Sequence, residues 1–343
     1  MSQYQLQRRG FDLGEVTIDA QSKDLLENWH QGLAVQLKGF CNAQLKAQQQ
    51  QILETEQLVY GVWDEQAIES LLCVSPYKER LEKQFNMLGS GISEHDQQEI
   101  ETVFFDGVTT DDLTKEQTAI PDLWMKTSWL SFYEQDASLR FRFSFGVDLE
   151  QDVAADPKRQ KFAAELCDKV FPESAILSKH RELSSLLTTL LKQDHVNFVE
   201  RIIYFNAPQG GAYLHHDLER GHAGVVYAQL SGQTFWLALP RAQLIDSIIT
   251  YSKQHTLAKS TQELCSAPDK LGAELDSFAN DDLITLINET PDFIQFLHQS
   301  GYSRLMQSGD VLLLPQSSSQ QCCWHSVFSL GDEVGQALSF AIR

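Results

Sequence analysis

The sequence predicts an α+β protein in which a mainly helical N-terminal region precedes a small β-sandwich or barrel. Two observations carry this prediction. Much of residues 1–194 has apolar residues three and four positions apart, which is the spacing of one helix face. Residues 195–343 contain seven or eight short runs rich in β-branched and aromatic residues, separated by Gly, Pro, Asn or Asp, as in antiparallel sandwiches and barrels. We therefore divide the chain near residue 195.

The N-terminal region combines helical patterns with a few strand-like ones. Residues 19–85 and 157–192 have mostly helical spacing, whereas residues 89–122 are rich in Gly, Asp and Thr, which is typical of irregular connections. Residues 139–147 alternate between apolar and polar side chains, as a half-buried strand does. We expect some strands of this region to extend the sheet of the C-terminal half. The region would either shape a substrate entrance or mediate homodimer formation.

The strand beginning at residue 139 places Arg140 and Arg142 on one face. Such a pair either faces an anion or lies on a solvent-facing strand surface. The second interpretation is the commoner one for exposed strand arginines.

Residues 241–304 interrupt the strand pattern of the C-terminal half. The runs RAQLIDSIITYSKQ and PDFIQFLHQSGYSRL have helical spacing. We predict a helical insertion between the fourth and fifth strands of the barrel.

Composition excludes several classes of partner. The chain has 27 Lys and Arg against 47 Asp and Glu, a formal net charge of −20. A surface this acidic repels nucleic-acid phosphates and anionic lipids, so we expect neither nucleic-acid nor membrane binding, and a basic partner is favoured. The chain contains no long apolar run and no apolar signal-peptide core near its start, and its six cysteines form no C-x-x-C pair. We therefore expect a cytoplasmic protein with reduced thiols.

The sharpest local motif is the run YLHHD, which ends at Asp217. In an extended chain, residues two apart point to the same face, so His215 and Asp217 can bind one metal ion while His216 points away. A third ligand from another strand would complete a face of two imidazoles and a carboxylate. This facial triad leaves positions open on the metal, as non-haem Fe(II) oxygenases require.

His325 is the best candidate for the third ligand. It lies in a strand that follows a Pro-containing loop, in the run GDVLLLPQSSSQQCCWHSVFSL. The other histidines are weaker candidates because they lie close to the motif or in helical and linker contexts, namely His222, His195, His255 and His298.

Together these motifs resemble one family. The runs PQGGAYLHHDLERGHAGVVYAQLSGQTFWLALP, GDVLLLP, CCWHSV and ALSFAIR are similar to the JmjC and cupin-like branch of the Fe(II)/2-oxoglutarate-dependent oxygenases, in particular to bacterial ribosomal-protein hydroxylases and asparaginyl hydroxylases. The resemblance covers roughly residues 198–343 without the insertion. It implies a double-stranded β-helix, a hydroxylation reaction, Fe(II) held by His215, Asp217 and His325, and 2-oxoglutarate as co-substrate.

The sequence departs from the family at the position that binds the far carboxylate of 2-oxoglutarate. Many JmjC-like members bind it with a Lys two residues beyond the Gly of the Q-x-x-G strand pair, where this chain has Thr234. Other branches use an Arg on the last strand, and by alternation Arg343 shares the polar face of ALSFAIR. We therefore predict Arg343 as the anchor, with Thr234, Tyr204 and Gln229 as hydrogen-bonding partners.

Two alternatives to the oxygenase remain open. A non-catalytic cupin-like metal-binding or scaffold protein that has lost its 2-oxoglutarate site is compatible with Thr234. A metal-dependent cupin with another reaction is less compatible, because such proteins commonly use more histidines and a Glu. For the oxygenase, the acidic composition and the resemblance favour a protein side chain, such as a basic one, as substrate, with a small molecule as the competing interpretation.

Overall fold

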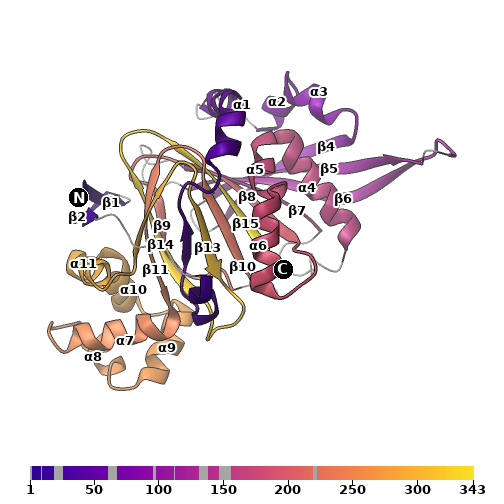
Figure 1. Cartoon of the computed structure of the whole chain (residues 1–343). Coiled ribbons are helices and arrows are strands. Elements are labelled where there is room, and N and C mark those ends of the chain that lie inside the picture. The colour runs from indigo at the N-terminus through magenta and orange to yellow at the C-terminus, as the bar shows by residue number, and fades with distance from the viewer. Residues whose placement is uncertain are drawn as a thin grey trace.

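The computed structural model describes residues 2–8, 10–18, 26–60, 68–95, 98–111, 113–130, 138–146, 156–218 and 222–343. Its centre is a nine-stranded antiparallel sheet with the strand order β3, β13, β10, β15, β8, β7, β6, β5, β4 (Figure 1). The strands of this larger sheet are β3 (Val35–Leu37), β4 (Phe85–His95), β5 (Gln98–Thr110), β6 (Gln117–Leu130), β7 (Ser138–Phe145), β8 (Phe198–Asn206), β10 (Gly224–Gln229), β13 (Val311–Pro315) and β15 (Gly335–Ile342).

A smaller antiparallel sheet faces part of the larger one. It has the order β12, β11, β14, β9, with the bounds β9 (Gly211–His215), β11 (Gln233–Pro240), β12 (Ser303–Gln307) and β14 (Cys323–Leu330). Buried side chains from β10, β13 and β15 meet those from β11, β12 and β14 in one apolar cluster, which includes Tyr227, Trp236, Met306 and Leu312. Eight strands of the C-terminal half thus form two four-stranded layers with a common core. The short runs rich in β-branched and aromatic residues predicted that this half consists of packed antiparallel strands.

In the described part of residues 1–194, strands cover nearly as many residues as helices, whereas we expected a mainly helical region with a few strands. Residues 89–122, which we expected to be irregular, lie largely in the long strands β4, β5 and β6. Their glycines mark irregularities within strands rather than loops, because the register shifts next to Gly89 and Gly107. A side chain at Gly107 would collide with Phe162, whose ring lies 2.2 Å from the position of a Cβ.

The strands β4 to β7 extend the larger sheet beyond β8, as the sequence analysis expected of some N-terminal strands. β7 pairs directly with β8, so no structural boundary separates the two halves at residue 195. In Figure 1 the strands β4, β5 and β6 reach away from the body of the molecule.

Helices cover the face of the larger sheet that is turned away from the smaller sheet. Phe141 and Phe143 of β7 pack there against Phe171, in the largest buried apolar cluster. The helix α4 starts at an Asp156 N-cap, whose carboxylate accepts a hydrogen bond from the backbone N–H of Arg159 at 2.9 Å. The helical elements of the N-terminal region are η1 (Leu26–Gln31), α1 (Asn42–Tyr60), α2 (Ile68–Leu72), α3 (Tyr77–Leu81), α4 (Pro157–Val170), η3 (Pro172–Ser174), α5 (Ala175–Ser178) and α6 (Arg181–Leu191).

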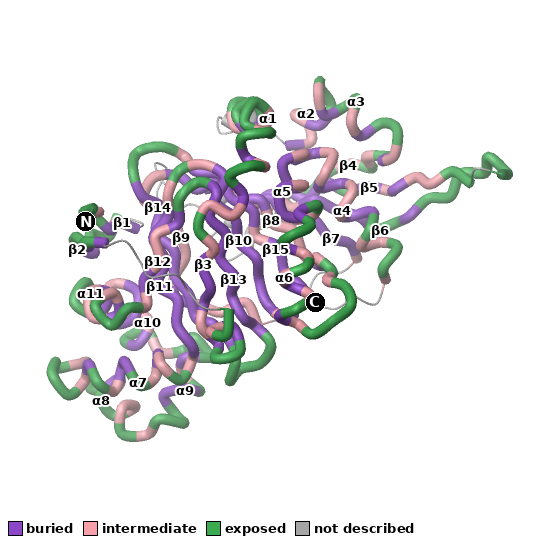
Figure 2. Tube along the Cα trace, viewed as in Figure 1, coloured by how far each residue is buried: buried purple, intermediate pink, exposed green. Residues whose placement is uncertain are grey.

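The predicted helical excursion corresponds to five helices between β11 and β12. They are α7 (Arg241–Ser252), α8 (Lys259–Leu264), α9 (Pro268–Ser277), α10 (Asp281–Glu289) and α11 (Pro291–Gln299). Their apolar faces pack against the outer side of the smaller sheet, where Phe235 and Phe328 lie in the same cluster as Leu244, Ile248 and Phe293. The strands are therefore buried and the helices expose their outer faces (Figure 2).

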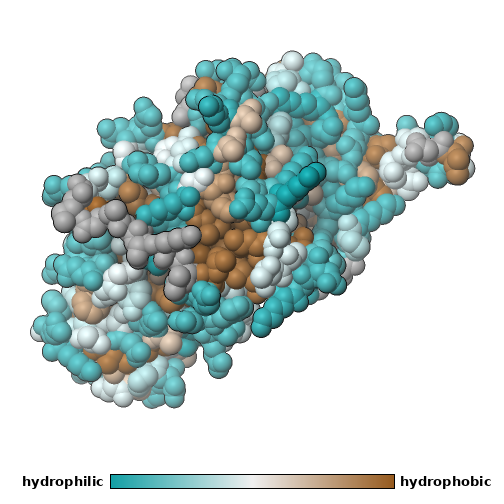
Figure 3. All heavy atoms as spheres, in the orientation of Figure 1, coloured by the Kyte–Doolittle hydropathy of each residue, from teal (hydrophilic) through white to brown (hydrophobic). Residues whose placement is uncertain are grey.

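A two-stranded hairpin at the N-terminus, β1 (Ser2–Arg8) and β2 (Phe11–Ile18), lies beside the smaller sheet and α11. In the face that Figure 3 draws, hydrophilic residues cover most of the surface, and apolar residues gather over the middle strands of the larger sheet. No helix in the described part of the chain combines the length and hydrophobicity of a membrane span.

Candidate metal centre and adjoining cavities

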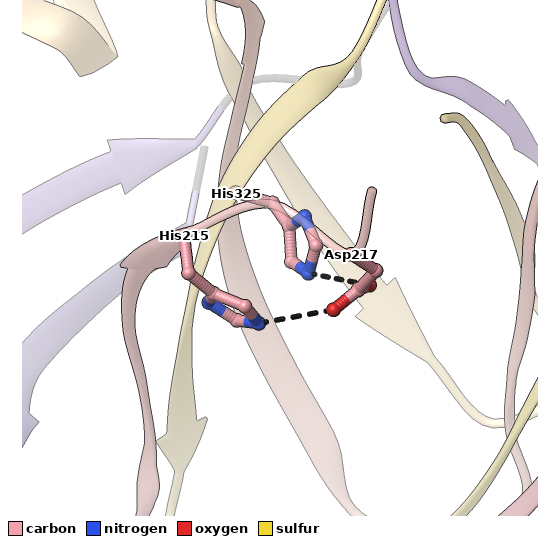
Figure 4. Close-up of side chains that lie close together, drawn as sticks. All are labelled: His215, Asp217 and His325. Carbon is pink, nitrogen blue, oxygen red and sulfur yellow. Dashed lines mark ion pairs between the residues drawn. The ribbon is translucent and has the colours of Figure 1, made fainter. Parts of the chain in front are cut away.

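Three side chains converge where β9 ends (Figure 4). His215 is the last residue of β9, Asp217 follows two residues later, and His325 lies directly opposite His215 on β14. The Asp217 carboxylate lies 3.4 Å from Nε2 of each histidine, through one oxygen each. Among the described residues, these three form the one group of His, Cys, Asp or Glu side chains close enough to hold a metal ion, with ligand atoms within 4.8 Å of one another.

Backbone carbonyls fix the tautomer of both histidines. Nδ1 of His215 lies 2.6 Å from the carbonyl oxygen of Tyr213, and Nδ1 of His325 lies 3.2 Å from that of Cys323. A carbonyl can only accept, so each Nδ1 must carry the proton. Each Nε2 then presents a lone pair toward Asp217, which is the arrangement of metal-ligating histidines. The donor set therefore fits a divalent first-row metal.

The electrostatics of the three groups are strongly coupled. Burial would raise the pKa of Asp217, but the two histidines outweigh this effect and hold the pKa well below its usual range. Burial, followed by the neighbouring His215, lowers the pKa of His325 to about 4. For His215, burial lowers the pKa, but the hydrogen bond and charge of Asp217 raise it to a net value above the usual one. At neutral pH the site thus offers a carboxylate and a neutral His325.

We expect the affinity for a divalent metal to fall as the pH falls, and His215 is the first group responsible. Its pKa is raised, so a proton competes with the metal for Nε2 at a higher pH than for an ordinary imidazole. Below that pKa the affinity should drop by about tenfold per pH unit, because one proton must leave for the metal to bind. Calorimetric titration with Mn(II) between about pH 5 and pH 8 measures this slope. A flat profile over that range would contradict it.

An inner cavity of about 270 Å³ adjoins the three side chains. It lies between the two sheets, and Trp236 stacks on His325 with ring centroids 5.5 Å apart. The wall of this cavity combines aromatic and small polar side chains with one guanidinium group. Its lining includes Ser138, Arg140, Tyr204, Asn206, Tyr227 and Ser339.

A second cavity of about 250 Å³, which we call the outer cavity, adjoins the same groups. Both cavities share Arg140, Tyr204, His215 and Asp217, so they are neighbouring compartments at one metal centre. The outer cavity is the more strongly charged of the two. It is also lined by Arg142, Glu200, His216 and His222.

Of the groups predicted to contact 2-oxoglutarate, Tyr204 lines the cavities, whereas Thr234 and Gln229 do not. Thr234 donates a hydrogen bond to Gln229 Oε1 at 2.8 Å and accepts one from Trp236 Nε1 at 2.9 Å. Tyr227 donates to the same Gln229 oxygen at 2.7 Å. Thr234 and Gln229 therefore hold Tyr227 and Trp236 in place behind the cavity wall, and their contact with 2-oxoglutarate stays a prediction.

Arg343, the predicted anchor, does not line either cavity. The alternation was assigned properly, because Ser339 and Ala341 of the same face do line the outer cavity. Arg343, however, comes after the last residue of β15, and its backbone N–H and C=O bond to Asn197 at 3.0 and 3.1 Å. It thus lies beyond the end of the strand pair.

The cation that does line both cavities is Arg140, in β7. The sequence analysis placed Arg140 and Arg142 on one face but favoured a solvent-facing surface. The alternation of residues 139–147 was the feature of the sequence that could have indicated a cavity-facing Arg140. The sequence does not show that β7 pairs with β8, which is what brings Arg140 to the cavities. Arg142 forms an ion pair with Glu200 in the outer cavity.

β9, which carries His215, is an edge strand and is held from outside by polar groups. The buried Arg8 guanidinium donates to the carbonyl of Ala212 at 2.7 Å, and the Asn288 side chain accepts from the backbone N–H of Leu214 at 2.6 Å. The sequence analysis did not identify these residues. Because they come from β1 and α10, only the folded chain brings them to β9.

No protein-family model and no curated protein matches the chain. Among solved structures, one that it resembles is an oxidoreductase of the 2OG-Fe(II) oxygenase family from Burkholderia pseudomallei, with a TM-score of 0.35 and 7% identity over 94% of this chain and 92% of that one. Another is the ribosomal oxygenase YcfD from Escherichia coli, with a TM-score of 0.25 and 13% identity over 71% of this chain and 39% of that one. At these identities and TM-scores, neither similarity bears on what this chain does.

Proposed function

We propose that this chain is an Fe(II)- and 2-oxoglutarate-dependent oxygenase that hydroxylates a protein side chain or a small molecule. The observation that carries the proposal is the facial set of His215, Asp217 and His325, with both Nε2 atoms directed at the carboxylate and a cavity beside them. Two imidazoles and one carboxylate leave three metal positions for a bidentate co-substrate and O₂.

The strand order supports this proposal independently of the metal ligands. Along the chain the eight C-terminal strands alternate between the two layers except at β11 and β12, which both lie in the smaller sheet: β8, β10, β13 and β15 form one layer and β9, β11, β12 and β14 the other. We interpret this arrangement as the double-stranded β-helix that the sequence resemblance implies. It places the H-x-D motif at the end of the second strand and the distal histidine on the seventh.

The protein residues would act by holding and shielding the reacting groups. Bound Fe(II), together with 2-oxoglutarate and O₂, supplies the oxidising chemistry for C–H hydroxylation. His215, Asp217 and His325 would hold the metal, and the carbonyls of Tyr213 and Cys323 keep the imidazole lone pairs on the metal side. Trp236 and Tyr227 would exclude water from the inner cavity.

The outer cavity is the proposed entrance for the target group, because charged side chains line it next to His215 and Asp217. The net charge of −20 favours a target that carries positive charge. A peptide with a basic side chain meets this condition, and so does a small amine.

Anaerobic titration tests the metal, the co-substrate and the open positions together. The protein loaded with Fe(II) should develop the weak visible charge-transfer band of a bidentate chelate when 2-oxoglutarate is added, saturating at one equivalent per chain. Metal binding without this band would favour the non-catalytic metal-binding alternative. That alternative is compatible with Thr234, which stands where many JmjC-like members have a Lys. Failure to bind any divalent metal would contradict both.

A further inference from the structure

The cation beside the metal centre comes from a strand outside the two four-stranded layers. Arg140 of β7 pairs with Tyr204 of β8, and Tyr204 pairs in turn with Ala337 of β15. Residues paired in this way lie side by side on one face of a sheet. The face that carries Tyr204 into the inner cavity therefore also carries Arg140 to it, across the junction of the N-terminal strands with the barrel.

Arg140 is close to both the polar wall and the metal ligands. Its side chain lines the inner cavity together with Tyr204, its partner on β8, and with the candidate ligands His215 and Asp217. The next pair along the same two strands adds Ser138 and Asn206 to the lining of the inner cavity. A guanidinium, a phenol, a hydroxyl and an amide thus gather at one side of a cavity that has the metal ligands at another.

The charges in the inner cavity are suited to a dianion. Of the described residues that line it, Asp217 is the one carboxylate and Arg140 the one guanidinium or ammonium group. With a divalent metal bound, the metal, Asp217 and Arg140 carry two positive charges in total. A 2-oxo dicarboxylate has two negative charges, and neither would be buried without a partner.

We propose that Arg140 binds the far carboxylate of a 2-oxo dicarboxylate co-substrate, so that the N-terminal extension of the sheet completes the active site by placing this guanidinium beside Tyr204, Ser138 and Asn206. The inference rests on the proposed function and deepens it. It assigns Ser138 and Arg140 of β7 a direct role in co-substrate selection. A guanidinium suits this role because its parallel N–H groups match the two oxygens of a carboxylate.

The test compares 2-oxoglutarate with 2-oxovalerate, which has the same chain length but a methyl group in place of the far carboxylate. Both compounds can chelate Fe(II), so the visible band reports binding of either one in anaerobic titrations. The wild-type protein should bind 2-oxoglutarate more tightly by about tenfold to a thousandfold, the range expected for one buried charged pair. In Arg140→Met this preference should disappear, through weaker 2-oxoglutarate binding with unchanged 2-oxovalerate binding.

Two further variants show whether the effect is specific to the guanidinium of Arg140. Arg343→Met removes the cation that the sequence favoured, and it should retain the full preference for 2-oxoglutarate. Arg140→Lys keeps the charge but loses the paired N–H groups, and it should keep part of the preference. If Arg140→Met does not fold, the test is whether Arg140→Lys has a reduced preference for 2-oxoglutarate over 2-oxovalerate.

The outcomes separate the two proposals. The role of Arg140 is overturned if folded Arg140→Met keeps the wild-type preference for 2-oxoglutarate. It is also overturned if this variant loses affinity for both compounds equally. Neither result contradicts the proposed oxygenase function. A loss of the preference in Arg343→Met overturns the role of Arg140 too. If neither compound produces a band with the wild-type protein and Fe(II), the proposed function fails and this inference fails with it.

Discussion

Replacement of His215 by alanine is expected to lower the affinity for Fe(II) or Mn(II) by at least about a hundredfold. Loss of a group that merely orients a ligand costs about 10- to 100-fold, and His215 supplies one of three ligand atoms itself. The fold should survive, because the His215 side chain is 35% exposed at the end of a strand. Calorimetric metal titration and thermal unfolding of the metal-free protein measure the two effects separately.

His216→Ala is the matched control for this prediction. The ring of His216 lies edge-to-face against Trp324, with centroids 5.0 Å apart, and the metal-binding group does not include it. Loss of this adjacent imidazole should leave metal affinity within a few-fold of wild type. Equal losses in the two variants would contradict the alternation on which the site is built.

The convergence of His215, Asp217 and His325 could be predicted because it depends mostly on local features. The i, i+2 spacing of His215 and Asp217 places both on one side of an extended chain regardless of the rest of the fold. Prediction of His325 as the third ligand required one further inference. The strand pattern around His325 indicated that it belongs to the same barrel as His215. Its position directly opposite His215 is a register that the sequence does not specify.

The position of Arg140, which lines both cavities, could not be predicted in the same way. Arg343 was favoured because it follows the distal histidine on the correct face, and alternation does not say where a strand ends. Arg140 lies 75 positions before His215 in the sequence, and it reaches the cavity only because β7 adds to the barrel's sheet at β8. A pairing between strands so far from the motif is set by packing, here by Phe141 and Phe143 against Phe171.

The long strands of the N-terminal region were missed for a related reason. Gly and Asp within residues 89–122 indicate turns in most sequences, but here Gly107 is required by the close approach of Phe162. Val103 and Phe105 alternate into the core on either side of the exposed Phe104. This alternation is visible in the sequence and indicates a strand. We nevertheless expected irregular connections because the segment is rich in Gly, Asp and Thr.

A substitution at Gly211 should disturb both the fold and the metal site. Gly211 starts β9 opposite Phe328 of β14, and a Cβ built on it would lie 2.0 Å from the carbonyl oxygen of Val327. Its φ of +144° is also a conformation that side chains disfavour. β9 can accept an alanine there only by moving away from β14, which separates His215 from His325.

We therefore expect Gly211→Ala to lower the free energy of unfolding by about 2–5 kcal/mol, from overpacking and backbone strain together. Gly331→Ala is the control, because Gly331 has a φ of +82° but no atom within 4 Å of the point that an added Cβ would occupy, so it should lose only about 1–2 kcal/mol. Urea denaturation measures both losses. Folded Gly211→Ala should in addition bind Mn(II) more weakly than Gly331→Ala, since only the former displaces a ligand-bearing strand. Equal unfolding energies and equal Mn(II) affinities for the two variants would show that contact between β9 and β14 at Gly211 does not set the distance between the two histidines.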